Sequence, residues 1–225
     1  MKKDLTELVF ILDRSGSMGG LEKDTIGGFN GMLEKQKNEA GDALVSVVLF
    51  DDRVEKIYDR AALADVSNLT EKEYFVRGCT ALLDAIGGAI HHIGNIHKYA
   101  RSEDVPEKTI FVITTDGMEN ASHTYDYNKV KKMIEKRQEK GWEFMFLGAN
   151  IDAAKEAGKM GIKATRAVDY NCDSEGTALN YEVLSDTIAC LRCCPTAEGM
   201  GAVMDKGSWS ARIKKDHSSR ASKRA

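Results

Sequence analysis

The chain has 225 residues, of which 42% are hydrophobic and 30% are charged, and its formal net charge is −3. This length suits one large α/β domain or two small ones, and the composition is that of an ordinary globular protein. The charge gives the whole chain no bias toward nucleic acids or anionic membranes, and no stretch approaches the roughly 20 apolar residues of a membrane-spanning helix.

The first residues and the cysteines indicate the cellular environment. Residues 1–4 are followed by an acidic, interrupted segment rather than by the apolar core of a secretory signal. The five cysteines are an odd number, and four of them fall between residues 172 and 194. We therefore expect reduced thiols and a cytoplasmic protein without membrane contact.

Strands and helices are predicted to alternate along the chain. Runs of apolar residues indicate buried strands at 8–12, 43–50, 109–115 and 142–147, with a last short strand at 164–168. Amphipathic patterns indicate helices at 21–36, 126–140 and 176–192, one that ends at 159, and one that Thr80 caps and that carries Leu83 to Ile93. Residues 61–77 are expected to form short helical pieces. A Gly27–Gly28 pair is costly inside a helix, so we expect close packing against the sheet there.

This order predicts an α/β fold with a doubly wound, mostly parallel central sheet and helices on both faces. Residues 54–58 are expected to form one antiparallel edge strand, because the link before them is too short for a parallel crossover. No linker is visible before about residue 195, so we predict one domain at 1–195. Residues 206–225 hold seven Lys or Arg residues against one acidic residue, and 196–225 is therefore predicted to be a basic, flexible tail.

A carboxylate and two hydroxyls follow the first buried strand at alternate positions. Asp13, Ser15 and Ser17 lie on a loop that Gly16 allows to turn sharply before the next helix. Three hard oxygen donors at this spacing suit a small hard cation such as Mg²⁺ better than they suit zinc. On its own, this D-x-S-x-S pattern is also compatible with a solvated turn.

Two further residues are expected to face the same loop. Asp116 ends the third buried strand as Asp13 ends the first, and Thr80 lies where a loop meets a helix. In parallel sheets, ligands bind beyond the carboxyl ends of the strands, where the connections diverge. We therefore expect Asp13, Thr80 and Asp116 to border one crevice.

The combination of Asp13-x-Ser15-x-Ser17, Thr80 and Asp116 resembles a von Willebrand factor A (VWA) domain with an intact metal-ion-dependent adhesion site (MIDAS). The resemblance covers roughly residues 5–195, and the chain is similar to the stand-alone VWA proteins of the bacterial cytosol. It implies a Rossmann-like fold in which the hydroxyls ligate Mg²⁺ or Mn²⁺ and the two aspartates hold the ion directly or through water. It also implies an open coordination position, which an Asp or Glu carboxylate of a protein partner completes.

Several neighbouring residues are open to two interpretations. Gly117, Glu119 and Asn120 follow Asp116 and are candidate ligand-binding residues at the rim of the site, although Glu119 and Asn120 equally suit a plain solvated turn. Asp51 and Asp52 also end a strand and could support the site from behind, but we favour a plain turn. Asn150 and Asp152 could line the same face, but we favour caps of the next helix. Cys190, Cys193 and Cys194 could indicate zinc or redox chemistry, but no second C-x-x-C pair and no histidine at a fitting spacing accompany them, so we interpret them as thiols that do not bind zinc.

We expect a metal-dependent protein-interaction module and not an enzyme. One alternative is a Mg²⁺-dependent phosphohydrolase with Asp13 as nucleophile, but the haloacid-dehalogenase-like pattern has a second Asp where this chain has Ser15. Another alternative is nucleic-acid association through the basic residues of 206–225. A solvated tail that improves solubility is the simpler interpretation of that segment.

Overall fold

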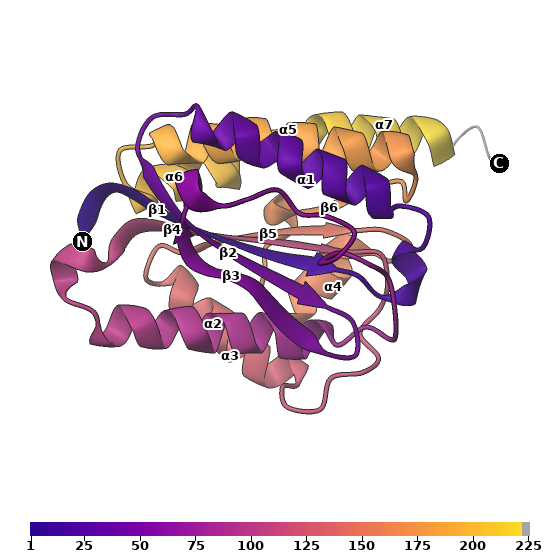
Figure 1. Ribbon diagram of the computed structural model, residues 1–225, viewed down its shortest axis with the longest axis horizontal. Coiled ribbons are helices and arrows are strands. Elements are labelled where there is room, and N and C mark those ends of the chain that lie inside the picture. The colour runs from indigo at the N-terminus through magenta and orange to yellow at the C-terminus, as the bar shows by residue number, and fades with distance from the viewer. Residues whose placement is uncertain (222–225) are drawn as a thin grey trace.

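The computed structural model describes residues 1–221, and it contains a six-stranded sheet with helices on both faces (Figure 1). The strands are β1 (Lys2–Asp13), β2 (Asp42–Phe50), β3 (Val54–Ala62), β4 (Pro106–Thr115), β5 (Glu143–Gly148) and β6 (Ala167–Asp169). The helices are α1 (Glu22–Lys37), α2 (Leu82–Tyr99), α3 (Tyr127–Gln138), α4 (Ala153–Lys159), α5 (Ser174–Cys193), α6 (Ala197–Asp205) and α7 (Ala211–Ala221). The sheet order is β3-β2-β1-β4-β5-β6, and of these strands β3 runs antiparallel to its neighbour. The predicted fold class is confirmed.

Strand β1 lies in the middle of the sheet because both of its faces are apolar. Phe10 and Leu12 pack into a core with α1, α5, α6 and α7, whereas Val9 and Ile11 pack into a second core with α2, α3 and α4. Figure 1 shows these two helical layers above and below the sheet. An uninterrupted apolar run is what a strand buried on both faces requires.

The paths of the connections locate the candidate site. From β1 the chain passes through α1 to β2 on one side, and from β4 it passes through α3 to β5 on the other. Helices α1 and α3 cover opposite faces of the sheet (Figure 1). The chain therefore diverges between the carboxyl ends of β1 and β4, which is where open α/β sheets bind ligands.

The region after residue 195 differs from the predicted flexible tail. It forms α6 and α7, and Met200, Met204 and Ile213 are buried in the same core as α1 and α5. The prediction was based on the basic residues and overlooked that Met200 and Met204 share one face of a helix. The domain boundary predicted at 195 is therefore wrong, and residues 222–225 of that segment lie outside the described residues.

Three local predictions were also wrong. Residues 61–77 form one 3-10 turn, Leu63–Asp65, instead of several helical pieces, because β3 continues as far as Ala62. Thr80 does not cap α2, whose N-cap is Ala81. The last strand is shorter than predicted, because a 3-10 turn at Ala164–Arg166 precedes it.

Among the helices within 1–221, none combines the length and the apolar character that a membrane crossing requires.

The glycine pair in α1 gives a test of helix packing. Gly28 approaches helix α5 rather than the sheet, since a Cβ atom on it would lie 2.3 Å from Cδ2 of Tyr181, whereas Gly27 faces open space. We expect Gly28→Ala to lower the free energy of unfolding by roughly 1–3 kcal/mol through overpacking. Gly27→Ala should raise it by up to about 1 kcal/mol through helix propensity. Urea denaturation of both variants measures the difference, and equal effects would contradict this packing.

Candidate metal site

Three loops meet beyond the carboxyl ends of β1 and β4, namely residues 13–17, 78–80 and 116–120. A hydrogen bond joins each pair of loops: Gly16 N to Gly78 O (3.1 Å), the Ser17 hydroxyl to Asp116 Oδ1, and Asn120 N to Thr80 O (3.1 Å). The predicted metal ligands all lie on these loops. The structure therefore brings together residues that are up to 103 positions apart, from Asp13 to Asp116.

Asp13 is buried under the first loop, with only 1% of its surface exposed. Its Oδ1 accepts a hydrogen bond from Ser15 N at 2.7 Å, and its Oδ2 accepts one from the Thr115 hydroxyl at 2.6 Å. The hydroxyls of Ser15 and Ser17 are 3.0 Å apart. The carboxylate thus holds the loop in a turn that brings the two serine hydroxyls together.

Thr80 completes a small cradle around Gly117. A Cβ atom on Gly117 would lie 3.3 Å from the Thr80 hydroxyl oxygen and 3.4 Å from that of Ser17. Thr80 is only 3% exposed, yet its hydroxyl has no hydrogen-bond partner among residues 1–221. This oxygen is not one of the enclosed side-chain atoms that lack a partner, so it is accessible from the cradle, where a ligand can contact it.

The electrostatics of the two aspartates are unusual. Burial raises the pKa of Asp13 to about 6, and the nearby charge of Asp116 adds to this, although hydrogen bonds from Thr115 and Ser15 lower it. Burial also raises the pKa of Asp116. Within residues 1–221, no Lys, Arg or His side chain forms an ion pair with either carboxylate. Buried carboxylates are ordinarily paired or metal-bound, so this pair lacks a positive charge.

These donors fit a hard divalent cation. Two carboxylates and three hydroxyls offer oxygen atoms, which are the ligands that Mg²⁺ and Mn²⁺ prefer. Within residues 1–221, no group of three His, Cys, Asp or Glu side chains is placed to hold a metal, so the hydroxyls are needed to complete the shell. Asp13, Ser15, Ser17, Thr80 and Asp116 can therefore hold the ion, with water filling the remaining positions.

The rim residues hold the loops together. Glu119 accepts hydrogen bonds from Leu83 N (2.8 Å) at the start of α2 and from Ser122 N (2.7 Å), so its carboxylate ties its own loop to the start of α2. The side chain of Asn120 accepts from Thr80 N at 2.9 Å. Together with the bond from Asn120 N to Thr80 O, this fixes the Thr80 backbone on both sides. Neither residue belongs to a plain solvated turn.

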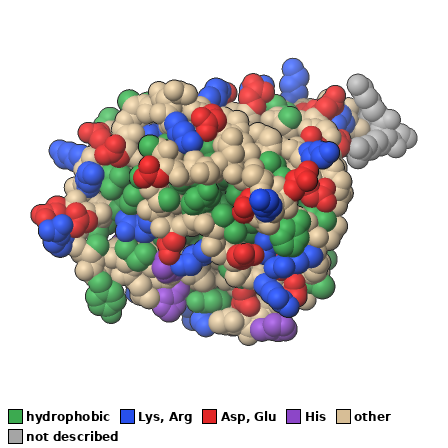
Figure 2. All heavy atoms as spheres, in the orientation of Figure 1, with side chains coloured by type: hydrophobic (Ala, Val, Ile, Leu, Met, Phe, Trp, Pro, Cys, Tyr) green, Lys and Arg blue, Asp and Glu red, His purple; other side chains and the backbone are tan. Residues whose placement is uncertain are grey.

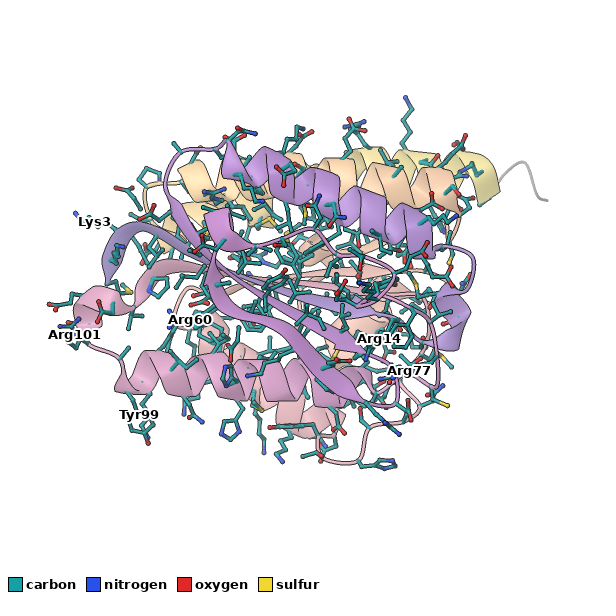
Figure 3. The ribbon with its side chains drawn as sticks, viewed as in Figure 1. Lys3, Arg14, Arg60, Arg77, Tyr99 and Arg101 are labelled. Carbon is teal, nitrogen blue, oxygen red and sulfur yellow. The ribbon has the colours of Figure 1, made fainter. Side chains whose placement is uncertain are left out.

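A buried ion-pair network beneath the site is absent from the sequence-based prediction. Arg14 and Asp51 are both completely buried, and Arg14 Nε donates to Asp51 Oδ2 at 2.9 Å. Arg77 Nε donates to the same oxygen at 2.7 Å. Figure 3 shows Arg14 and Arg77 side by side at the right-hand end of the sheet. Asp51 was interpreted as a plain turn, and that interpretation is wrong because this carboxylate joins two loops.

Two further polar groups, a tyrosine hydroxyl and a cysteine thiol, form hydrogen bonds with the two aspartates of the site. The Tyr74 hydroxyl donates to the carbonyl oxygen of Asp13 at 2.5 Å. Cys172, between β6 and α5, donates from Sγ to Asp116 Oδ2 at 3.5 Å. Burial raises the pKa of Cys172 to about 12, and the charge of Asp116 contributes. The contact between this thiol and the Asp116 carboxylate has no signal in the sequence, since Cys172 is 56 positions from Asp116.

The remaining candidates have separate roles. Asp152 caps α4, as predicted, by accepting from Lys155 N at 2.9 Å. Asn150 does not cap this helix. It has a left-handed φ of 56°, and its Nδ2 approaches Asp116 O at 3.5 Å. The cysteines form no disulfide within residues 1–221.

The sequence matches no protein-family model, and comparison with curated proteins gave no match. Solved structures do resemble the chain. The von Willebrand factor domain of the type V pili tip protein Mfa5 from Porphyromonas gingivalis has a TM-score of 0.61 at 11% identity, covering 84% of this chain and 97% of that one. For the pilus adhesin SpaC from Lactobacillus rhamnosus GG, the TM-score is 0.59 at 11% identity, covering 84% of this chain and 30% of that one.

A third similar structure carries a metal. It is proximal thread matrix protein 1 from the mussel byssus with a zinc-occupied MIDAS motif, with a TM-score of 0.54 at 15% identity. The alignment covers 83% of this chain and 46% of that one, so the chain matches about half of the mussel protein. The chain has the von Willebrand factor A fold. At these identities the likeness establishes the fold alone.

Gly117 allows the cradle of this VWA fold to be tested with one methyl group. In Gly117→Ala, the added Cβ would stand 3.3–3.4 Å from the hydroxyl oxygens of Thr80 and Ser17, where a bound cation needs access to both. We expect the variant to fold and to lose at least about tenfold in Mn²⁺ affinity, the usual effect of disturbing a metal's immediate surroundings. Isothermal titration with Mn²⁺ measures this, and unchanged affinity would exclude the cradle as the metal position.

Proposed function

We propose that the protein is a divalent-cation-dependent protein-interaction module, in which Asp13, Ser15, Ser17, Thr80 and Asp116 form an intact MIDAS. The observation that carries the proposal is the meeting of three hydroxyls with two buried carboxylates that no basic side chain of residues 1–221 neutralises. A divalent cation would supply the missing charge, and the hydroxyl donors favour Mg²⁺ or Mn²⁺.

The donor set also indicates what the bound cation would do. Three of the five ligands are neutral hydroxyls, so they cancel less of the ion's charge than carboxylates would. When bound, the metal supplies an electrophilic position that an incoming Asp or Glu carboxylate of a partner protein completes. Binding and release then require no covalent step, and we propose an interaction site rather than an enzyme.

The alternatives have less support. A nucleophilic aspartate of the haloacid-dehalogenase type works with a second carboxylate two residues further on, and Ser15 occupies that position here. For nucleic-acid binding, two of the basic residues of 206–225 are already paired, Arg212 with Glu182 and Arg220 with Asp173. Acidic and basic side chains are also interspersed over the face in Figure 2.

We further propose that the protein acts in the cytoplasm, where its free thiols would stay reduced.

Thermal unfolding in Mg²⁺, Mn²⁺ or EDTA tests the metal. Metal at 100-fold above its dissociation constant should stabilise the wild type by about 2.7 kcal/mol. At roughly 2–4 °C per kcal/mol, the melting temperature should rise by several degrees. Ser17→Ala removes one ligand from an exposed position and should reduce the shift, whereas Asp65→Asn, at an exposed carboxylate outside the site, should not. Absence of a shift in the wild type would contradict the proposal.

Affinity capture then tests the partner. Proteins retained by the wild type in Mg²⁺, but not in EDTA and not by Ser17→Ala, are the expected partners. Neutralising Asp and Glu residues of a retained protein one at a time should identify a single carboxylate that binding requires. Retention that survives neutralisation of each surface carboxylate in turn would contradict a carboxylate-recognising site.

A further inference from the structure

A second cavity lies at the edge of the sheet opposite the candidate metal site. It has a volume of about 190 Å³ and lies where β4 and β5 begin, beside the C-terminal ends of α2 and α3, which share one layer in Figure 1. Three Lys or Arg side chains, Lys98, Arg137 and Lys140, line it together with a single acidic side chain, Glu107. The wall of this cavity therefore carries an excess of positive charge.

The guanidinium of Arg137 is held in place without a polar partner. It lies over the indole of Trp142, 4.8 Å from the ring centroid, and against Gly94, where a Cβ atom would overlap it. Within residues 1–221 this guanidinium donates no hydrogen bond and forms no ion pair, and burial lowers the pKa of Arg137. Charged groups that leave water are ordinarily paired, so this cation lacks a negative charge.

Stabilisation of the helix end does not account for this arrangement. Basic residues in the last turn of a helix offset the partial negative charge of its carbonyl groups, and they commonly donate hydrogen bonds to those carbonyls. Arg137 lies in the last turn of α3, but its guanidinium donates to no carbonyl of residues 1–221. Its N–H groups therefore remain available to a ligand in the cavity.

A hydroxyl without a partner borders the same cavity. Thr109 in β4 lines the cavity, is 2% exposed, and has no hydrogen-bond partner for its hydroxyl within residues 1–221. Its oxygen is not one of the enclosed side-chain atoms that lack a partner, so it is accessible from the cavity, where a ligand can contact it. Two kinds of donor, a buried hydroxyl and a fixed guanidinium, thus border one cavity.

We propose that this cavity binds a phosphoryl group, either of a small phosphate monoester or as inorganic phosphate. The guanidinium of Arg137 can donate two parallel N–H bonds to phosphate oxygens, and the Thr109 hydroxyl can donate a third. A phosphate monoester carries a charge of about −1.5 to −2 at neutral pH, which suits a wall with three basic side chains and one acidic side chain. The cavity is smaller than the roughly 300–1,000 Å³ of pockets for drug-sized ligands, so only a small ligand fits.

Isothermal titrations with inorganic phosphate and with glycerol 3-phosphate test the proposal, in EDTA so that bound metal does not contribute. We expect at least one of them to bind the wild type, and the tighter ligand identifies the source of the phosphoryl group. Arg137→Gln should lower that affinity at least about tenfold, because it removes hydrogen bonds from a charged donor. Arg137→Lys should also lower it, since lysine has no planar fork. Thr109→Val, which removes only the hydroxyl, should lower it severalfold.

Lys132→Gln is the matched control, because it removes a positive charge from an exposed position of α3 outside the cavity. It should bind phosphate as the wild type does. Acetate, a monoanion, should bind the wild type at least about tenfold more weakly than phosphate. Absence of phosphate and ester binding to the wild type, equal affinities in Arg137→Gln and Lys132→Gln, or acetate binding as tight as phosphate binding would each overturn the proposal.

Discussion

Replacement of Asp13 by Asn is expected to stabilise the metal-free protein and to abolish its response to Mg²⁺. Asp13 is 1% exposed and has no ion-pair partner within residues 1–221, so its charge is buried without compensation. Its pKa is raised from 3.8 to about 6, mainly by burial. At about 1.4 kcal/mol per pKa unit, ionised Asp13 costs the fold on the order of 3 kcal/mol at neutral pH.

The amide keeps the local hydrogen bonds. In Asp13→Asn, the side-chain oxygen can still accept from Ser15 N, and the new NH₂ group can donate to the Thr115 hydroxyl. That hydroxyl can then donate to Gly117 O, which is 3.1 Å away. The substitution therefore removes the charge without leaving a buried donor or acceptor unpaired, and the gain in stability should be most of the cost of the charge.

Urea denaturation in EDTA and in Mg²⁺ measures both parts of this prediction. In EDTA at neutral pH, Asp13→Asn should unfold at a higher urea concentration than the wild type, and added Mg²⁺ should reverse the order. Because the pKa is raised in the folded state, metal-free wild type should gain stability as the pH falls through about 6 toward 3.8. The variant should lack this gain. A less stable variant in EDTA would mean that Asp13 is already compensated in the metal-free fold.

How much the sequence predicts depends on whether a signal is local. The apolar run before Asp13 and the spacing of Ser15 and Ser17 are local, and they predicted both the central strand and one loop of the site. Asp116 followed from a general rule, since strand ends of a parallel sheet meet at one edge. Thr80 followed from its place between a loop and a helix and from the resemblance to VWA domains. The residues that hold those loops in place had no comparable rule.

Arg14 shows why the supporting network was not predicted. An arginine between Asp13 and Ser15 in a polar loop would ordinarily be exposed, yet Arg14 is completely buried. Only the tertiary fold brings it to Asp51, 37 positions away. The same limit applies to the segment 196–221, where a basic composition concealed three buried apolar residues. The overall composition of such helices is dominated by their exposed residues, whereas the spacing of a few apolar residues determines whether the helices pack against the core.

The second large effect is expected from Asp51→Asn, which leaves a buried cation without its main partner. Arg14 and Asp51 are both completely buried, and removal of one member of such a pair typically costs 3–5 kcal/mol, so about 3 kcal/mol is expected here because Glu55 still pairs with Arg14. At roughly 2–4 °C per kcal/mol, the melting temperature should fall by about 6–12 °C. Thermal unfolding in EDTA measures this loss separately from any effect of metal.

Arg77 provides the matched control because it binds the same carboxylate oxygen from a more exposed position. Arg77 Nε is 2.7 Å from Asp51 Oδ2, but its side chain is 36% exposed, so Arg77→Gln should lower the melting temperature much less than Asp51→Asn does. Equal losses in Asp51→Asn and Arg77→Gln would show that burial of Arg14 does not determine the stability of this network.

The same pair should also affect metal binding, although neither residue is a ligand. Arg77 N donates to Arg14 O, and Ala81 N donates to Asp51 O, so the network joins the Asp13 loop to the segment that carries Thr80. Once Asp51 loses its charge, the attraction that holds Arg14 and Arg77 to its carboxylate is lost, and these segments should move apart. We expect Mn²⁺ affinity to fall by roughly 10–100-fold in Asp51→Asn, as for other residues that orient metal ligands. An unchanged affinity in a destabilised variant would mean that the three loops hold the Thr80 hydroxyl in place without this network.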